Sequence, residues 1–459
     1  MKKILLVYLP FCTPASPPYS ITHLYSFLKN NCSEHIEVLD LNLEFHKLKF
    51  PEYQTYYKNI KNWSNYDKTT HEYIKLTSTV YSDNNKKVVK GEKPEFFNEL
   101  IKKITDKEPD IVAFSIVYSS QAFYGYSIIK ELTSSNKQII NIIGGPAINE
   151  KLMKIADKVL NNEIDLLDYI LGKKITEEQN PEHDKLNFNF SIDFSIYNLT
   201  EYFTIKPVIP IKTSSTCYYK KCAFCSHFNK TPYHEFSLDL IKKTIINSTQ
   251  RYFFLIDDMI PTKRLLEIAE VFKPLNIYWT CQLKPTKDLN YEILKKLKES
   301  GLRLVMWGVE SGNDRILKLM RKGTNKKEIK QVLQDSHDVG IKNNVYILLG
   351  FPTETKDEFL ETIEFLKKNE RNIDLVSASV FGLQKNTEIY NHPDMFGITN
   401  IIEEERTILD PKISYELREG LTQDEACKLR NRYKKTIEHI NKYPKTMSFF
   451  REHMFCLIE

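Results

Sequence analysis

The chain has 459 residues, 41% hydrophobic and 12% aromatic, which is the composition of a packed globular protein of two or three domains rather than of a disordered chain. Its 65 Lys and Arg residues exceed its 60 Asp and Glu residues by only five, so composition gives no sign of nucleic-acid binding. No window approaches 18 consecutive apolar residues, so no membrane span is predicted, and eight cysteines in so long a chain are no disulfide framework. We expect a cytoplasmic protein whose clustered thiols are metal ligands or catalytic groups.

Residues 1–165 alternate apolar strand patterns with helical patterns. The predicted strands are 3–9, 36–43, 110–118 and 138–145, and the predicted helices are 20–31 and 122–135. This alternation predicts an α/β fold with a doubly wound, Rossmann-like parallel sheet, which binds ligands at the carboxyl edge of its strands. Residues 50–95 show little periodicity and are interpreted as a partly helical insertion.

A second alternation follows a linker that is predicted over residues 166–202 from its charge, Asn and Pro content. Strand and helix patterns then take strict turns, and six strands predict a partial (β/α)6 barrel of the TIM type over 203–381, with the chemistry at the strand carboxyl ends. Residues 382–459 are predicted to form a short helical cap, with a helix at 421–443, beside a wide entrance for a peptide or other large substrate.

Three cysteines lie close together in the stretch TSSTCYYKKCAFCSHFNK, directly after the first barrel strand: Cys217, Cys222 and Cys225. Thiolates suit zinc or an iron–sulfur cluster. A structural zinc site needs four ligands, and His227 is the local residue that could complete it. Three cysteines alone would leave one iron of a four-iron cluster open to a further ligand, and the barrel context favours this alternative.

This pattern resembles the radical S-adenosylmethionine (SAM) superfamily, most closely its subgroup with an N-terminal cobalamin-binding domain. The usual family motif is C-x-x-x-C-x-x-C, and this chain has one more residue in the first gap. Further family motifs follow at successive strand ends in the expected order, over about residues 203–381: IDD (256–258), QLKP (282–285), GVESG (308–312) and LLGFPTET (348–355).

The resemblance implies one 4Fe-4S cluster on the three cysteines, SAM at its open iron, and an electron donor such as flavodoxin or ferredoxin. It also implies that Phe224 lies beside the SAM adenine. Further SAM contacts are expected from Asp258, Lys284, Glu310, Gly350 and Pro352. The alternatives are an ion pair of Glu310 with Arg303 or Lys284, and a Lys284 that is merely solvated.

The resemblance raises the possibility that the first domain binds cobalamin. The D-x-H-x-x-G sequence, whose histidine ligates cobalt in many relatives, does not occur, but Ser115 and the pair Gly144-Gly145 resemble other cobalamin-binding positions. The alternative is that the serine ends a strand and the glycines make an ordinary tight turn.

The reaction class depends on that question. With cobalamin, the resemblance implies methylation of an unactivated carbon, with a precursor peptide of a ribosomally made natural product as the favoured substrate. Without it, a peptide epimerase is implied, in which a cysteine thiol returns the hydrogen. Cys281 is expected at the active-site rim, and Cys427 and Cys456 over the barrel mouth, although each could be a small buried hydrophobe. A redox-sensing iron–sulfur protein without catalysis is a third, less favoured alternative.

Overall fold

The structure is a computed structural model of the whole chain, and it describes residues 1–61, 63–135, 138–175, 186–226 and 231–458. The chain divides into two compact units. The first comprises Met1–Pro207, Lys243–Thr249 and Glu405–Pro411, and the second comprises Val208–Lys242, Gln250–Glu404 and Lys412–Glu459. His227, the residue that would complete a zinc site, lies outside the described residues.

The first unit contains a parallel sheet in the order β2-β1-β3-β4-β5. Its strands are β1 (Lys3–Tyr8), β2 (His35–Asp40), β3 (Ile111–Ser115), β4 (Ile140–Gly144) and β5 (Lys158–Val159). The doubly wound sheet is thereby confirmed, although the two-residue β5 is too short for a sequence pattern to reveal. The strand predicted at 36–43 ends early because the Asp40 carboxylate accepts a hydrogen bond from the Leu43 amide (2.9 Å) and caps the next helix.

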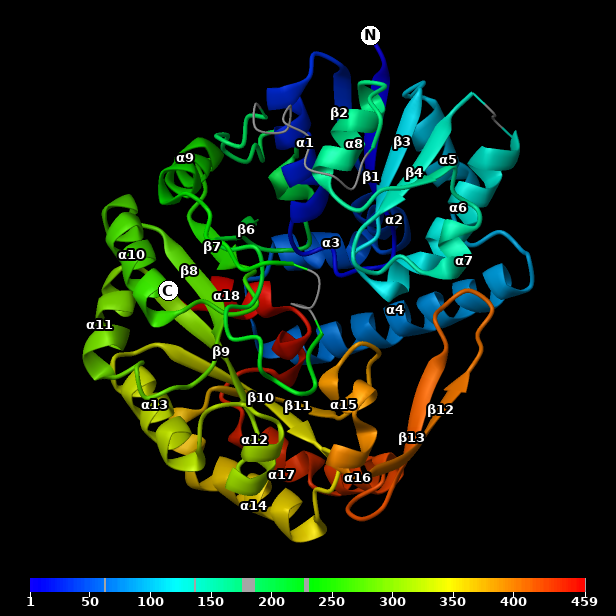
Figure 1. Cartoon of the computed structure of the whole chain (residues 1–459). Helices are drawn as coiled ribbons and strands as arrows, with labels where there is room; N and C mark the ends of the chain where they lie inside the picture. The colour runs from blue at the N-terminus through cyan, green and yellow to red at the C-terminus, as the bar shows by residue number, and fades with distance from the viewer. Residues whose placement is uncertain (62, 136–137, 176–185, 227–230, 459) are drawn as a thin grey trace. The chain divides into compact units, whose positions relative to one another are not determined.

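Helices surround this sheet (Figure 1). They are α1 (Tyr19–Asn31), α2 (Leu41–Lys49), α3 (Pro51–Lys58), α4 (Tyr66–Val89), α5 (Phe97–Thr105), α6 (Ala122–Ser135), α7 (Glu150–Met153) and α8 (Glu163–Ile170). The insertion at 50–95 is thus more helical than its sequence suggests, since α4 alone has 24 residues. Its buried stripe includes Thr70, Thr77 and Asn84, and these polar residues conceal the helical period. The predicted linker begins inside α8, and its Phe194 is buried.

The second unit contains a parallel sheet in the order β11-β10-β9-β8-β7-β6, six strands within the described ranges, and this confirms the predicted partial barrel. The strands are β6 (Val208–Ile211), β7 (Tyr252–Leu255), β8 (Tyr278–Leu283), β9 (Leu302–Glu310), β10 (Lys342–Leu349) and β11 (Leu375–Val380). The helices between them are α9 (Leu238–Ser248), α10 (Thr262–Phe272), α11 (Tyr291–Glu299), α12 (Asp314–Leu319), α13 (Lys326–Asp338) and α14 (Lys356–Lys368).

One face of these strands is covered by helices α10, α11, α13 and α14 (Figure 1). Trp279 of β8 packs edge-on against Phe272 of α10, and Trp307 of β9 donates a hydrogen bond to Asn343, whose amide in turn reaches the Leu333 carbonyl of α13. Because side chains alternate along a strand, the residues next to these in sequence point to the barrel interior.

The C-terminal segment corrects the prediction of a purely helical cap. It contains α15 (Glu388–Asn391), an antiparallel ribbon of β12 (Ile398–Glu404) and β13 (Lys412–Leu417), and then α16 (Gln423–Arg432), α17 (Lys434–Ile440) and α18 (Arg451–Leu457). The helix predicted at 421–443 is divided at Tyr433.

Helix α18 lies against the interior face of the barrel. The Arg451 guanidinium lies 5.2 Å from the ring centre of Phe254, and the Phe455 ring packs edge-on against Tyr252 at 5.4 Å. Tyr252 and Phe254 alternate in β7 with Phe253 and Leu255, which pair with the helix-facing Trp279 and Cys281. The end of the chain therefore fills part of the barrel. Among the described helices, none is both long and apolar enough to cross a membrane.

Candidate active site

The loop after β6 carries Cys217, Cys222 and Cys225, all partly exposed. Among the described residues, His, Cys, Asp and Glu side chains form no group of three close enough to hold one metal ion. The thiolates of a four-iron cluster bind different irons and are spread more widely than the ligands of a single ion. Three partly exposed thiols on one loop are a donor set that suits such a cluster.

A buried carboxylate, Asp257, holds the beginning of this loop. It follows β7, and it accepts hydrogen bonds from the amide and hydroxyl groups of Thr213 (3.0 Å each) and of Ser214 (2.7 Å each). Burial raises the pKa of Asp257, and these hydrogen bonds act in the opposite direction. Asp258, the residue singled out from the sequence, is only partly buried, so the neighbouring aspartate is the one that organises the loop.

Glu310, at the end of β9, forms an ion pair with Lys322 at 2.8 Å, and their side chains are only 14% and 6% exposed. The alternative partners expected from the sequence, Arg303 and Lys284, are wrong: Arg303 donates to the Lys298 carbonyl instead. The carboxylate raises the pKa of Lys322 against the opposing effect of burial. Glu310 has a φ of 65°, a conformation that costs a residue with a side chain energy and is typical of functional sites.

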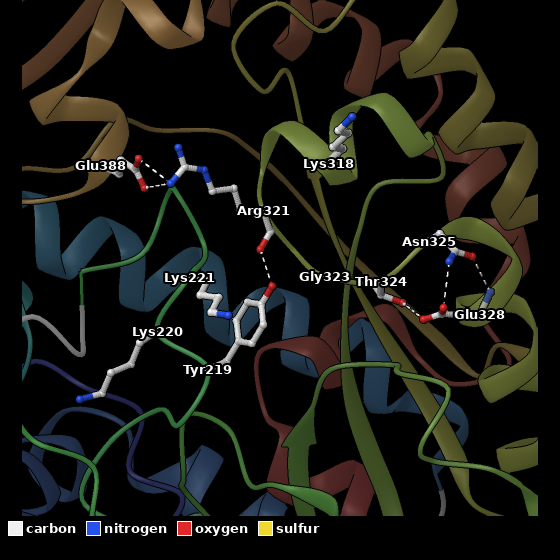
Figure 2. Close-up of a pocket in the computed structure, with 10 residues that line it drawn as sticks. All are labelled: Tyr219, Lys220, Lys221, Lys318, Arg321, Gly323, Thr324, Asn325, Glu328 and Glu388. Carbon is white, nitrogen blue, oxygen red and sulfur yellow. Dashed lines mark hydrogen bonds and ion pairs between the residues drawn. The ribbon is translucent and has the colours of Figure 1, made fainter.

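Lys284 is buried, which contradicts the alternative that it is merely solvated. Its ammonium nitrogen lies 3.2 Å from the ring centre of Tyr219, and burial lowers its pKa to about 8. The Tyr219 hydroxyl donates to the Arg321 carbonyl (2.8 Å), which fixes the ring in place (Figure 2). The sequence did not reveal Lys322 or Tyr219, because their partners are distant along the chain.

Phe224 and the segment 350–352 lie together. The Phe224 ring packs edge-on against Phe351 (centres 6.4 Å apart), and Lys322 lies 5.9 Å from the centre of the Phe224 ring. Gly350 has a φ of 69°, and a Cβ there would lie 2.5 Å from the Ala426 Cβ of α16. The close approach of α16 therefore explains why position 350 is a glycine. Pro352 is buried in the same turn.

The candidate hydrogen donors are placed very differently. Cys281 is fully buried on the helix-covered face with Trp279, so the expectation that it points to the active-site rim is wrong. Cys456 is buried in α18, inside the barrel rather than over its mouth. Cys427 is partly exposed on α16, which reaches the carboxyl ends of β10 and β11 through Ala426 beside Gly350 and through Gln423, whose side chain donates to the Phe381 carbonyl.

The candidate cobalamin positions lie at the carboxyl edge of the first unit's sheet. The Ser115 hydroxyl is 2.9 Å from the Ser20 hydroxyl. A Cβ at Gly144 would lie 2.9 Å from the Leu160 carbonyl oxygen, and one at Gly145, whose φ is 118°, would lie 2.3 Å from the Ile116 carbonyl oxygen. Backbone packing therefore explains both glycines, and these residues by themselves are no observation in favour of cobalamin.

Comparison with known proteins agrees with this geometry. Residues 211–366 match the model of the radical SAM superfamily. An uncharacterized methyltransferase of Pyrococcus horikoshii is 25% identical over 332 residues, which are 64% of this chain and 72% of that protein. A tRNA-2-methylthio-N(6)-dimethylallyladenosine synthase of Thermotoga petrophila is 29% identical over 135 residues, 28% of this chain and 29% of that protein.

Two solved structures share the fold of nearly the whole chain. The cobalamin-dependent SAM radical enzyme OxsB, with aqua-cobalamin bound, aligns with a TM-score of 0.65 and 15% identity over 91% of this chain, which spans 65% of the OxsB chain. The radical SAM methyltransferase TsrM from Kitasatospora setae, with cobalamin and a [4Fe-4S] cluster bound, aligns with a TM-score of 0.60 and 14% identity, over 93% of this chain and 84% of TsrM.

The fold and the site together define a radical SAM enzyme. Residues 211–366 form the radical SAM domain, and the chain as a whole shares its fold with OxsB and TsrM, whose structures contain cobalamin. The radical SAM domain implies a 4Fe-4S cluster and SAM as cofactors, and the cysteine loop provides the matching donor set.

Proposed function

We propose that this protein uses a SAM-derived radical to methylate an unactivated carbon of a peptide substrate. The observation that carries the proposal is the assembly at the barrel's carboxyl end: three thiols on one loop, with the Glu310–Lys322 pair and Lys284 beside them. Support for methylation comes from the fold shared with TsrM and OxsB and from the relative named as a methyltransferase. The peptide substrate rests on the resemblance of the cysteine loop to enzymes that mature peptide natural products.

A cluster bound there would supply the electron that cleaves SAM to methionine and a 5′-deoxyadenosyl radical, the species that would take a hydrogen atom from the substrate. Cys217, Cys222 and Cys225 would hold the cluster. Lys322 and Lys284 place positive charge beside the thiolates, where it offsets the negative charge of the ligands. Glu310, held by Lys322, presents a carboxylate for the polar groups of SAM, and Phe224 provides an aromatic face for its adenine.

Cobalamin, when bound to a domain of this fold, supplies a carrier for the methyl group. The residues of this chain at the carboxyl edge of the first sheet, with Ser115 and the Gly144-Gly145 turn, would face it.

Peptide epimerisation is a second candidate because of one observation. Cys427 is a partly exposed thiol on an element that reaches the carboxyl ends of the barrel strands. There it could return a hydrogen atom to a substrate radical and become a thiyl radical, which the electron donor and a proton would restore.

The test is anaerobic reconstitution with iron, sulfide and cobalamin, followed by reduction in the presence of SAM and a precursor peptide. Methylation predicts 5′-deoxyadenosine, S-adenosylhomocysteine and a peptide that is heavier by one methyl group. Deoxyadenosine without S-adenosylhomocysteine, together with solvent deuterium in the peptide, would favour epimerisation, and Cys427→Ala would then abolish deuterium uptake. If no deoxyadenosine forms with any acceptor, the proposal is wrong.

A further inference from the structure

A positively charged recess adjoins the cysteine loop in the second unit. This basic recess has a volume of about 570 Å³, and its lining includes Tyr219, Lys220, Lys221, Lys318, Arg321 and Thr324 (Figure 2). Arg321 is paired with Glu388 at 2.6 Å, and Glu328 accepts a hydrogen bond from Asn325 (2.9 Å). Among the residues that the structure describes, no carboxylate pairs with Lys221 or Lys318, and both are exposed, so the recess carries excess positive charge.

The basic recess leads directly to the candidate cluster ligands. A smaller hollow of about 200 Å³ shares Lys220, Lys221 and Glu388 with it, and Cys222 and Cys225 line this second hollow. Two of the three thiols therefore line a hollow that shares its wall with the basic recess. Electron transfer between proteins falls steeply with distance, so this is a short route for an electron to a cluster held there.

We propose that the basic recess is the docking surface for an acidic one-electron carrier protein that reduces the cluster, an inference that rests on the proposed function. The reduced centre of the carrier gives one electron to the cluster. The carrier is oxidised by one electron, the cluster is reduced by one electron, and no bond is made or broken. Exposed lysines suit this task, because charge complementarity steers weak and transient complexes without making them tight. Electron-transfer complexes are typically held by small interfaces, so a local group of lysines can contribute much of the attraction.

The variant that tests this proposal is Lys221→Glu/Lys318→Glu, since neither lysine has been given a role in holding SAM or the cluster. The matched control is Lys263→Glu/Lys295→Glu, which reverses two exposed lysines of α10 and α11 away from the recess. The probe is flavodoxin with its reductase. The iron content of each protein after reconstitution shows whether the cluster is retained.

Two measurements decide the outcome. The first is direct binding of oxidised flavodoxin at low and high salt, which needs no catalysis. We expect the recess variant to bind about 10-fold more weakly than wild type at low salt and to lose most of its salt dependence, while the control binds like wild type. The second is deoxyadenosine formation, which we expect to fall about 10-fold with subsaturating flavodoxin but to stay unchanged with dithionite.

The proposal is overturned if the recess variant binds flavodoxin as well as wild type does. It is also overturned if the control variant loses as much affinity for flavodoxin as the recess variant, which would indicate an effect of net charge. The same holds if the recess variant forms deoxyadenosine more slowly with dithionite as well, which would indicate local damage to the site. Weaker binding of an acidic substrate peptide with unchanged flavodoxin binding would assign the recess to the substrate instead. A wild-type protein that is inactive with dithionite would refute the proposed function, and the binding measurement would still decide the docking site.

Discussion

Asp257 shows how one side chain can position the loop that carries the three cysteines. Its carboxylate accepts from the backbone and the hydroxyl groups of Thr213 and Ser214, just before Cys217. We expect Asp257→Ala to lower the free energy of unfolding by about 3 kcal/mol, because buried amide donors are left without an acceptor. We also expect the Asp257→Ala variant to bind less iron per chain after reconstitution. The control is Asp258→Ala, and equal iron content in the two variants would contradict this role.

The protonation of Glu354 makes the free energy of unfolding depend on pH, and this dependence can be measured. Its carboxyl group is buried beside the Gly350 amide, which donates to it at 2.5 Å, and burial raises its pKa from 4.5 to about 8. Between these two values the folded protein binds more protons than the unfolded chain, so its contribution to the free energy of unfolding falls as the pH rises through this window.

We therefore expect Glu354→Gln to remove a pH-dependent change of about 4 kcal/mol between pH 4.5 and 8. Urea unfolding of wild type and variant across this range provides the measurement, and Asp357→Asn, at an exposed carboxylate of α14, is the control. Parallel stability curves for wild type and Glu354→Gln would show that Glu354 is ionised in the folded protein at neutral pH.

The sequence predicted residues of this site only where a motif marks them. The cysteines and Glu310 stand in motifs, and the structure places these motifs after β6 and at the end of β9. Lys322 could not be found in this way, because it stands in no motif. Its pairing with Glu310 depends on the turn after β9 and on the burial of both side chains, which only the structure shows. Cys281 was misplaced because a strand pattern gives alternation, but only packing shows which face the helices cover.

At the scale of elements, α18 stabilises the barrel from within. Phe455 is fully buried against Tyr252, whereas Phe449, shortly before the helix, is 40% exposed. We expect Phe455→Ala to cost about 3 to 4 kcal/mol through lost burial and a cavity, and Phe449→Ala to cost less than about 1 kcal/mol. Thermal unfolding of the two variants measures the difference. Equal losses would mean that α18 does not support the strands.

Long elements with a clear apolar period were predicted well, such as the barrel strands and their helices. Helix α4 and the β12–β13 ribbon were not, for opposite reasons. Polar Thr and Asn residues on the buried face of α4 weaken its period, and the ribbon is largely exposed, so no burial pattern marks its strands.

At the scale of the whole molecule, two parallel sheets follow one another along the chain, and each gathers its loops at the carboxyl ends of its strands. The sequence predicted both sheets because buried parallel strands are short apolar runs separated by helices. It could not determine which ligand each edge holds, since that depends on a few side chains in loops.

We propose that Cys217, Cys222 and Cys225 hold a four-iron cluster with one iron open to SAM. Electron paramagnetic resonance of the reduced, reconstituted protein tests it most directly. We expect a [4Fe-4S]⁺ spectrum that changes when SAM is added and that is lost in Cys222→Ala. A spectrum unaffected by SAM, or a protein that binds one zinc ion and no iron, would contradict it.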